Sequence, residues 1–255
     1  MQNLIDIVHE DGELLVINKP ADLVCHPTKR GPFSSLIGRV RHYLGAGAQP
    51  HLINRLDRET SGLVVVAKQS SPALQLRRLW ESGAVEKRYL AIVHRRVPAC
   101  SGMIDAPLGR DDFSLVAIKR RVRADGAPAR TAFALLKTFR RDGRDYSLLS
   151  VRPLSGRQHQ IRIHLAHYGH PIVGDKLYGA DEQCYLDFVR ERLSQQQRAA
   201  LLLPNHAPHA RSISFPWHAQ ERFFEAAPEP CFSNFASEPE LGDSRQACEL
   251  PFSAP

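Results

Sequence analysis

The sequence predicts an α+β fold, because strand-like and helix-like segments follow one another without the regular alternation of a doubly wound parallel sheet. The chain has 255 residues, of which 43% are hydrophobic and 24% charged. This is the composition of a globular protein that is large enough to bury its own core. No apolar run reaches the roughly eighteen residues that a membrane-spanning helix needs. Fibrous and wholly disordered proteins are therefore excluded.

The predicted strands are short runs rich in β-branched and aliphatic residues that stop at turn residues. Glu10-Asp-Gly-Glu separates the first two strands and predicts a hairpin, and Asp142-Gly143 predicts the turn of a second one. The continuous apolar run at 63–67 predicts a central strand that is buried on both faces. The expected strands are 5–9, 14–18, 63–67, 88–94, 131–139, 146–151 and 211–215.

The predicted helices have apolar residues at helical spacing. Serine is expected to cap the second helix, and Gly169 follows the third in the position that favours a left-handed glycine. The expected helices are 34–44, 71–82, 157–168 and 185–203. Beyond Pro228 the composition shifts to Pro, Ser, Ala and acidic residues. We therefore expect one folded domain over 1–228 and an acidic, disordered tail over 229–255.

The charge of the chain suits a polyanionic partner. Lys and Arg number 34 against 27 Asp and Glu, which gives a net charge of +7. The last 25 residues hold four acidic residues and one arginine, so the excess of positive charge lies in the rest of the chain. Nucleic acid is a suitable partner for a chain with this positive charge, because each phosphate contact releases counterions. The charge is explained equally well by solubility alone.

The cysteines indicate a reducing compartment. Five cysteines are scattered along the chain without CxxC or CxxH spacing, which argues against a zinc ribbon and against a disulfide framework. The first residues lack the basic and apolar regions of a secretory signal. We expect a cytoplasmic location.

A polar motif, Asn54-Arg-Leu-Asp-Arg-Glu-Thr-Ser-Gly-Leu, precedes the predicted buried strand. It puts Asp57 at the entrance to the core with Arg55 and Arg58 beside it. A carboxylate there requires a cation or backbone donors. Taken alone, Asp57 is either a catalytic carboxylate or the cap of a turn, and the turn cap is the commoner role.

Three further segments have a structural and a functional interpretation. Arg162, beside the apolar stripe of the helix at 157–168, can hold a carboxylate with two hydrogen bonds or lie in an ordinary amphipathic helix. Tyr89 is either packed in a sheet or stacked on a base. The basic run at 119–123 is either a solvated face or a phosphate-binding track. His159 and His164 are five residues apart, which does not match the zincin spacing.

Together these segments resemble the RluA-type RNA pseudouridine synthases. Five blocks occur in the order of that family's motifs and span roughly residues 4 to 226. The resemblance implies a stand-alone catalytic domain with the pseudouridine synthase fold, a mixed and mostly antiparallel sheet in two halves with a central active-site cleft. The blocks are Leu14-Leu-Val-Ile-Asn-Lys-Pro with Val24-Cys-His-Pro-Thr, the Asn54 motif, Lys87-Arg-Tyr, Gly156-Arg-Gln-His-Gln-Ile-Arg-Ile-His-Leu and Gly169-His-Pro-Ile-Val-Gly-Asp-Lys-Leu-Tyr-Gly.

The resemblance also implies the reaction. Specific uridines of ribosomal or transfer RNA are flipped out, the C1′–N1 bond is cleaved with the help of Asp57, and C5 is joined to C1′. Tyr89 packs against the target base and assists proton removal at C5, and Arg162 pairs with the aspartate. Arg55 fills the gap left by the flipped nucleotide. No cofactor or metal is implied, and we expect a monomer with no membrane partner. The remaining residues expected to bind RNA are Arg157, His159, Lys119, Arg120, Arg121 and Arg123.

Asn54 departs from the family pattern, since a histidine is usual before Arg-Leu-Asp, and we expect activity to survive this change. Two alternatives stay open. An RNA-binding or RNA-folding factor without turnover would keep the fold and lose the chemistry. A nucleoside hydrolase would need a second acid–base carboxylate, for which Asp175, in a Val-Gly-Asp turn, is the candidate.

Overall fold

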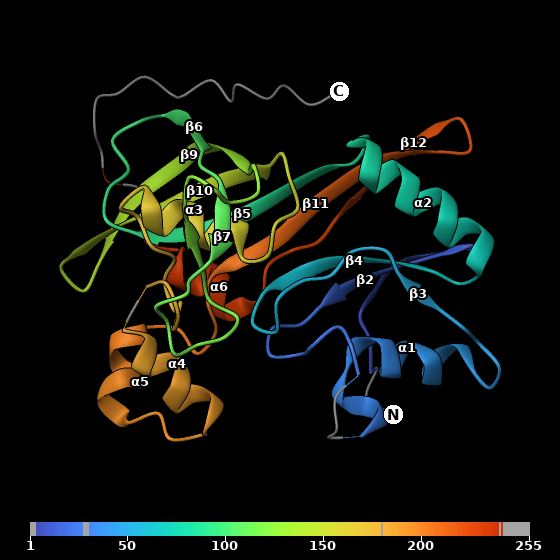
Figure 1. Ribbon diagram of the computed structural model, residues 1–255, viewed down its shortest axis with the longest axis horizontal. Helices are drawn as coiled ribbons and strands as arrows, with labels where there is room; N and C mark the ends of the chain where they lie inside the picture. The colour runs from blue at the N-terminus through green and yellow to red at the C-terminus, as the bar shows by residue number, and fades with distance from the viewer. Residues whose placement is uncertain (1–3, 28–30, 180, 240, 242–255) are drawn as a thin grey trace. The chain divides into compact units, whose positions relative to one another are not determined.

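The computed structural model describes residues 4–27, 31–179, 181–239 and 241. The chain divides into two compact units, each built from two stretches of sequence. The first unit comprises Met1–Arg88 and His209–Glu229, and the second comprises Tyr89–Pro208 and Pro230–Pro255. The α+β class is confirmed, with strands and helices in the order that Figure 1 labels.

The first unit contains a mixed sheet around β4, which is buried along its whole length as the apolar run predicts. β4 pairs antiparallel with β2 and β3 and parallel with β11. Gly62 lets β4 approach β11 closely, because a Cβ at this position would lie 2.3 Å from the carbonyl oxygen of Ala210. The strands are β1 (Ile7–Glu10), β2 (Leu14–Lys19), β3 (His51–Leu52), β4 (Ser61–Ala67), β11 (Pro208–Trp217) and β12 (Gln220–Glu225).

Two helices belong to the first unit, α1 (Leu36–Leu44) and α2 (Ser70–Ser82), with a short 3-10 turn, η1 (Pro32–Ser34), before α1. α2 buries Ala73 and Leu76 in the same apolar cluster as the inward-facing residues of β4. The predicted serine cap of α2 is wrong, because Gln69 takes the N-cap position and makes no side-chain capping bond.

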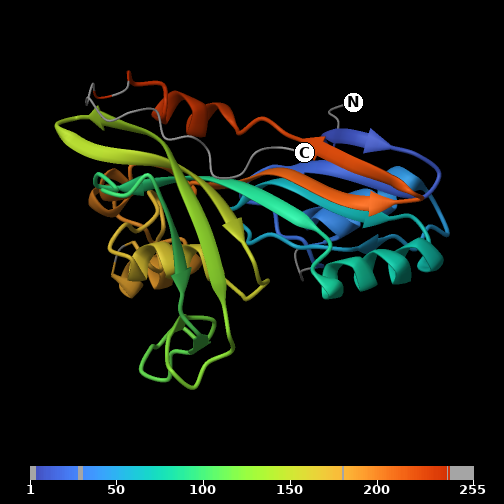
Figure 2. The ribbon, with the colours of Figure 1, turned by 90° about the horizontal axis from the view of Figure 1, so that it is seen from above.

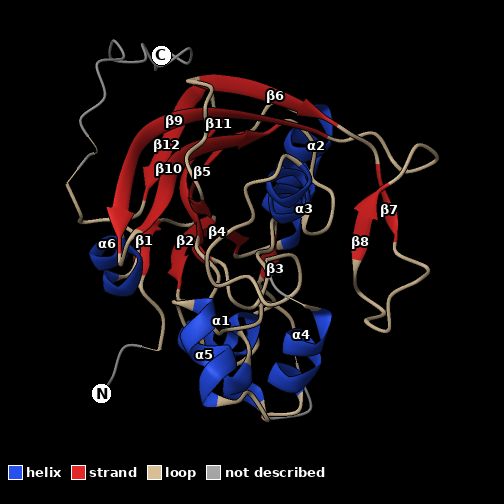
Figure 3. Cartoon of the chain, turned by 90° about the vertical axis from the view of Figure 1, so that its left-hand side faces the viewer, coloured by secondary structure: helices blue, strands red, loops and turns tan. Residues whose placement is uncertain are grey.

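The second unit contains an antiparallel sheet in the order β5–β10–β9–β6. The predicted hairpin is confirmed as two long strands, which lie side by side in Figure 2, and both turn residues, Asp142 and Gly143, have positive φ. A small separate sheet of two strands stands apart from it (Figure 3). The strands are β5 (Glu86–His94), β6 (Ser101–Asp105), β7 (Leu108–Arg110), β8 (Arg120–Val122), β9 (Arg130–Arg141) and β10 (Arg144–Pro153).

The helices of the second unit differ from the prediction at two places. α3 (Gln160–His167) begins three residues later than expected, because His159 has a left-handed φ of 56°. The single helix expected over 185–203 is wrong. It is replaced by α4 (Glu182–Val189) and α5 (Gln195–Leu201), since Glu191 is left-handed and Ser194 starts α5 with a capping box.

The expectation of a disordered tail from residue 229 onward is wrong for its first part. Helix α6 (Pro230–Phe235) follows directly, and its Phe232 and Phe235 are buried in the core of the second unit. The ring of Phe235 lies 5.1 Å from that of Tyr146. Residues 242–255 of the predicted tail lie outside the described residues.

Three further findings concern expectations from the sequence. β11 is not the last strand, because β12 follows it. Cys25, Cys184 and Cys231 are free, whereas Cys100 is disulfide-bonded, a bond that the cysteine pattern did not predict. Within the described part of the chain, no helix combines the length and hydropathy needed to cross a membrane.

Candidate active site

The loop that carries Asp57 connects β3 to β4 and is held by hydrogen bonds before and after the aspartate. Leu56 is buried, and its backbone N–H donates to Cys25 Sγ at 3.4 Å while the thiol donates to the Leu56 carbonyl at 3.4 Å. Beyond the aspartate, Thr60 N donates to the Asp57 carbonyl at 3.2 Å and closes a turn. Asp57 is half-buried and Arg55 is exposed.

Asn54, the departure from the family pattern, ties the start of this loop to β4. Its amide nitrogen donates to the Leu63 carbonyl at 3.1 Å, and its amide oxygen accepts from Val65 N at 2.8 Å. Both groups belong to the backbone of the buried strand. Asn54 thus satisfies backbone groups that would otherwise lack partners, and it holds the loop three residues before Asp57.

Replacing Asn54 with Ala is expected to lower the free energy of unfolding by about 2 kcal/mol, because it leaves a strand donor and a strand acceptor without partners. Urea unfolding followed by circular dichroism measures this change. The matched control is Gln196→Ala, which truncates an exposed amide on α5 and should change stability by less than about 0.5 kcal/mol. Equal stability of the two variants would show that Asn54 does not fasten the loop.

Lys19 lies beneath the same loop and is fully buried. Its ammonium group donates to the carbonyl oxygens of Pro20 at 2.8 Å, Leu23 at 2.9 Å and Arg58 at 3.2 Å. Burial lowers the pKa of Lys19 to about 8, although nearby acidic groups, Asp57 among them, act in the opposite direction. The lysine therefore positions the Arg58 carbonyl, one residue after Asp57, and contributes positive charge to the site at neutral pH.

The lowered pKa of Lys19 predicts a pH-dependent stability. Between pH 8 and pH 10.5 the unfolded chain binds a proton at this lysine that the folded chain has lost, so the free energy of unfolding rises with pH. The rise attributable to Lys19 is up to about 3 kcal/mol. Urea unfolding at several pH values should show it in the wild type and not in Lys19→Met. If the free energy of unfolding changes with pH in the same way in both proteins, Lys19 does not have the lowered pKa.

In the second unit, Tyr89 and Arg162 occupy regular elements. Tyr89 is half-buried on β5, opposite Val151 of β10, and packs against the apolar core. Arg162 on α3 is buried and makes a bidentate pair with Asp175, from Nε to Oδ2 at 2.7 Å and from Nη2 to Oδ1 at 2.9 Å. The helix thus presents a guanidinium whose plane is fixed by a carboxylate.

Asp175, the candidate second carboxylate of a hydrolase, also has a structural role in its turn. Its Oδ1 accepts from the backbone N–H groups of Leu177 and Tyr178. Burial would raise the pKa of this carboxyl group, but the Arg162 guanidinium outweighs burial and holds the pKa well below its usual range. An ionised carboxylate that is 1% exposed cannot serve as the exchanging acid–base group of a hydrolase, so this alternative loses its second carboxylate.

Tyr178, which sequence reasoning missed, brings three of the predicted site residues together. Its hydroxyl group is hydrogen-bonded to His159 Nδ1 at 2.9 Å and accepts from Arg120 N at 3.1 Å. The guanidinium of Arg162 lies over its ring, 5.0 Å from the centroid. The signal in the sequence was the position of Tyr178 in the block Gly174-Asp-Lys-Leu-Tyr-Gly, three residues after Asp175.

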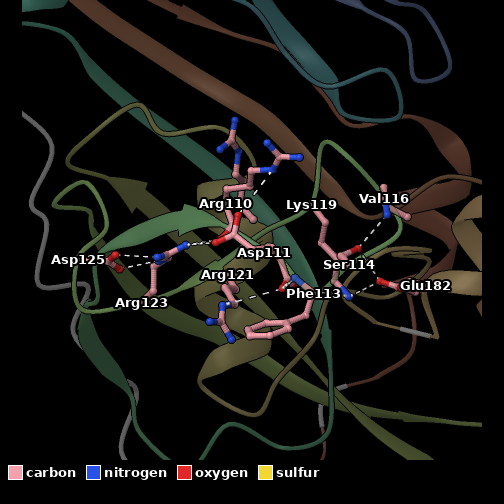
Figure 4. A network of polar contacts seen from close by, with 12 residues as sticks. Arg110, Asp111, Phe113, Ser114, Val116, Lys119, Arg121, Arg123, Asp125 and Glu182 are labelled. Atoms are coloured by element: carbon pink, nitrogen blue, oxygen red, sulfur yellow. Dashed lines mark hydrogen bonds and ion pairs between the residues drawn. The ribbon is translucent and has the colours of Figure 1, made fainter.

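The basic run at 119–123 lies on and around β8, and three of its charges, those of Lys119, Arg121 and Arg123, are paired with carboxylates (Figure 4). Lys119 Nζ is 2.9 Å from Glu182, Arg123 is 2.6 Å from Asp112 and 2.5 Å from Asp125, and Arg121 is 3.9 Å from Asp111. Hydrogen bonds from Ser114 and Lys119 lower the pKa of Glu182 to about 2. A phosphate that binds Lys119, Arg121 or Arg123 must therefore replace a carboxylate.

The remaining predicted RNA contacts lie nearby in the second unit. Arg157 is exposed and its Nε donates to the Pro128 carbonyl at 3.1 Å, and Arg120 Nε donates to Gln158 at 3.4 Å. Among the described residues there is no group of three or more His, Cys, Asp or Glu side chains placed to hold a metal ion.

Comparison with known proteins identifies relatives of this chain. Residues 13–167 match the family described as RNA pseudouridylate synthase. An uncharacterised RNA pseudouridine synthase of Bacillus subtilis (strain 168) is 40% identical over 70% of this chain, and one of Chloroflexus aurantiacus (strain ATCC 29366 / DSM 635 / J-10-fl) is 43% identical over 73%. The chain spans 62% of the length of each of these two relatives. The ribosomal large subunit pseudouridine synthase D of Yersinia pestis is 32% identical over 84% of this chain and 66% of its own length.

Solved structures are similar over nearly the whole chain. Human RNA pseudouridylate synthase domain containing 4 aligns with a TM-score of 0.68 and 27% identity, over 89% of this chain and 90% of that one. Human RNA pseudouridylate synthase domain containing 1 has a TM-score of 0.72 at 23% identity, over 94% of this chain and 91% of that one. The second likeness concerns the fold alone.

Proposed function

The chain belongs to the RNA pseudouridylate synthase family, and on this premise we propose that it converts specific uridines of structured RNA into pseudouridine. The target class is ribosomal or transfer RNA, and the relative from Yersinia pestis, named for the ribosomal large subunit, favours ribosomal RNA. The location would then be the cytoplasm. The observation that carries the proposal is the Asp57 loop, whose backbone is held by Asn54, Cys25 and Lys19.

In this proposal Asp57 performs the chemistry at the ribose. The carboxylate either attacks C1′ or removes the proton at C2′, and both routes require it to be ionised. The C1′–N1 bond breaks, the uracil turns while it stays bound, and C5 joins C1′, which releases Asp57 from C1′ in the first route and returns the proton to C2′ in the second. The C5 proton then leaves to a base, and N1 takes up a proton. No external oxidant, reductant or co-reactant is required.

The other residues bind and orient the nucleotide. In this proposal Tyr89 packs against the target base and assists the removal of the C5 proton. Arg162, which already holds Asp175 through Nε and Nη2, also pairs with the Asp57 carboxylate and favours its ionised form. Arg55, exposed beside Asp57, takes the place of the flipped nucleotide in the RNA. Lys119, Arg121 and Arg123 contact phosphates by exchanging their carboxylate partners for RNA, and Arg120, Arg157 and His159 make further contacts with the RNA.

Pseudouridine mapping of total RNA tests the function. Cells that lack the protein are compared with cells rescued by the wild type or by the Asp57→Asn variant. The proposal expects one or a few pseudouridines to disappear and only the wild type to restore them. If no site changes, or if Asp57→Asn restores the sites equally, the protein acts as an RNA-binding or RNA-folding factor instead.

A further inference from the structure

The segment that joins β7 to β8, residues 111–119, holds two large apolar side chains in solvent. We name it the β7–β8 loop. Phe113 is 83% exposed and Leu115 is 81% exposed. Single exposed apolar residues are common on protein surfaces, but two of this size within three positions mark a candidate contact surface. Neither residue has a role in the function proposed above.

Hydrogen bonds and one buried side chain give the tip of the β7–β8 loop a fixed shape. Ser114 Oγ donates to Glu182, the first residue of α4, at 2.6 Å, and Leu115 N donates to the same carboxylate at 3.4 Å. The next residue, Val116, is buried. The exposure of Phe113 is therefore built into an anchored loop, and a ligand that binds there has little chain to order.

The ring of Phe113 has a guanidinium group on one face. The Cζ atom of Arg121 lies over this ring, 5.0 Å from its centroid (Figure 4). The electron-rich face of an aromatic ring attracts a cation, so the arginine helps to hold the ring in place. Because Phe113 is 83% exposed, the opposite face of the ring is open to solvent. A flat aromatic face backed by a cation is the kind of platform on which unpaired bases stack.

The β7–β8 loop is joined to the part of the second unit that carries Arg162. Arg120 directly follows the loop, and its backbone N–H donates to the Tyr178 hydroxyl group at 3.1 Å. The Arg162 guanidinium lies over the ring of the same tyrosine, 5.0 Å from the centroid. An RNA that is held at Arg162 is therefore close enough to reach the loop with a further nucleotide.

An unpaired base suits the ring of Phe113 better than a phosphate or a second copy of the chain does. A phosphate at Lys119, Arg121 or Arg123 must replace a carboxylate, whereas a base that stacks on the ring breaks no ion pair. Residues 110–123 hold five basic and two acidic residues, and Glu182 adds a third carboxylate from α4. This excess of positive charge favours a polyanion, and it disfavours a second copy, which brings its own net charge of +7.

We propose that Phe113, backed by Arg121, binds an unpaired base of the substrate RNA by stacking, at a nucleotide other than the target uridine. This inference rests on the proposed function, because it takes the base from the RNA that is modified. Every base has a flat aromatic face, so the contact adds affinity without selecting a sequence. It holds an unpaired stretch of the RNA and does not touch the reacting atoms.

Fluorescence of Phe113→Trp in the full chain tests the stacking directly. Titration with a short single-stranded RNA should quench the emission that this substitution adds, because a stacked base quenches an indole ring. The chain has two tryptophans of its own, whose signal is measured in the wild type and subtracted. The matched control is Phe223→Trp, at an exposed phenylalanine on β12, and its added emission should not change. Inorganic polyphosphate, which carries negative charge without bases, should leave both variants unquenched.

Kinetics on the mapped RNA test the contribution to binding. Phe113→Ala and Phe113→Leu should each raise KM about tenfold and keep kcat, since the contact is the same in the ground state and the transition state. The slope of log affinity against log salt should equal that of the wild type, because no charge is removed. Phe113→Tyr keeps the ring and should keep KM within about twofold. Leu115→Ala, in the same loop, and Phe223→Ala, the matched truncation on β12, should do the same.

Four outcomes would overturn the inference: no quenching by RNA, equal quenching by polyphosphate, a wild-type KM in Phe113→Leu, or the same tenfold rise in Phe113→Tyr. Equal rises in Phe113→Ala and Leu115→Ala would assign the loop to an apolar partner instead. Quenching that grows with protein concentration in the absence of RNA would assign the ring to a second copy of the chain. Failure of the wild type to modify any RNA refutes the proposed function, and quenching by RNA in Phe113→Trp would still support the stacking site.

Discussion

Asp57→Asn is expected to reduce the rate of pseudouridine formation by at least about 10³-fold, while RNA binding stays within about twofold of the wild type. The amide has nearly the shape of the carboxylate, so the loop held by Asn54, Cys25 and Lys19 should keep its conformation. The amide can neither attack C1′ nor accept the C2′ proton. Single-turnover kinetics and a filter-binding assay on the mapped RNA measure the two effects separately.

The matched control is Asp22→Asn, which makes the same chemical change at a carboxylate that pairs with Arg58, the residue after Asp57, at 2.7 Å. This pair is solvent-exposed, so its loss should change the rate by only a few-fold. A residual rate in Asp57→Asn equal to that of Asp22→Asn would mean that the aspartate only shapes the loop. Loss of RNA binding together with turnover would leave the chemical role of Asp57 without support.

Asp175→Asn is expected to lower the free energy of unfolding by about 3–5 kcal/mol. The substitution leaves Arg162, which is 6% exposed, as a buried cation without its carboxylate partner. Urea unfolding near pH 7 measures the loss. The contribution of Asp175 should be the same at pH 7 and pH 5, since the folded pKa lies below the ordinary value of 3.8. It should decline only as the pH falls below that value toward the folded pKa.

A double variant distinguishes stability from function. Arg162→Met combined with Asp175→Leu removes both charges, and apolar replacement of a buried ion pair restores most of the lost stability. This variant should fold and remain inactive, because Arg162 is proposed to pair with Asp57. If Asp175→Asn unfolds at the urea concentration of the wild type, the buried pair is not a determinant of stability. Full activity of the folded double variant would show that Arg162 is not needed for the reaction.

The sequence predicted most elements of the fold because their signals are local. The Asp142-Gly143 turn and the apolar run of β4 require no knowledge of distant residues. The break between α4 and α5 was missed, because a left-handed Glu191 has no signature in composition. α6 was missed because its polar, proline-containing surroundings resemble a linker, while its two phenylalanines fill a core built by residues about ninety positions earlier.

The sequence predicted which residues belong to the candidate site. It did not predict the contacts that these residues make with other side chains. Asp57, Tyr89 and Arg162 stand out as polar or aromatic residues in motifs, and their roles stay predictions. Pairings such as Arg162 with Asp175 depend on how a helix and a later loop meet, which residue spacing does not encode. The basic run was visible in the sequence, but Glu182, which pairs with Lys119, is 63 positions away.

The discontinuity of the first unit has a consequence for synthesis. Met1–Arg88 leaves the ribosome long before His209–Glu229 is made, and all of Tyr89–Pro208 is translated in between. Until then the apolar cluster lacks Ile213, Phe215, Trp217 and Phe224, and β4 has no parallel neighbour at its start. Nascent chains therefore carry exposed apolar surface and a partly unpaired buried strand, the features that chaperones bind. Completion of the unit that holds Asp57 is thus one of the last events of folding.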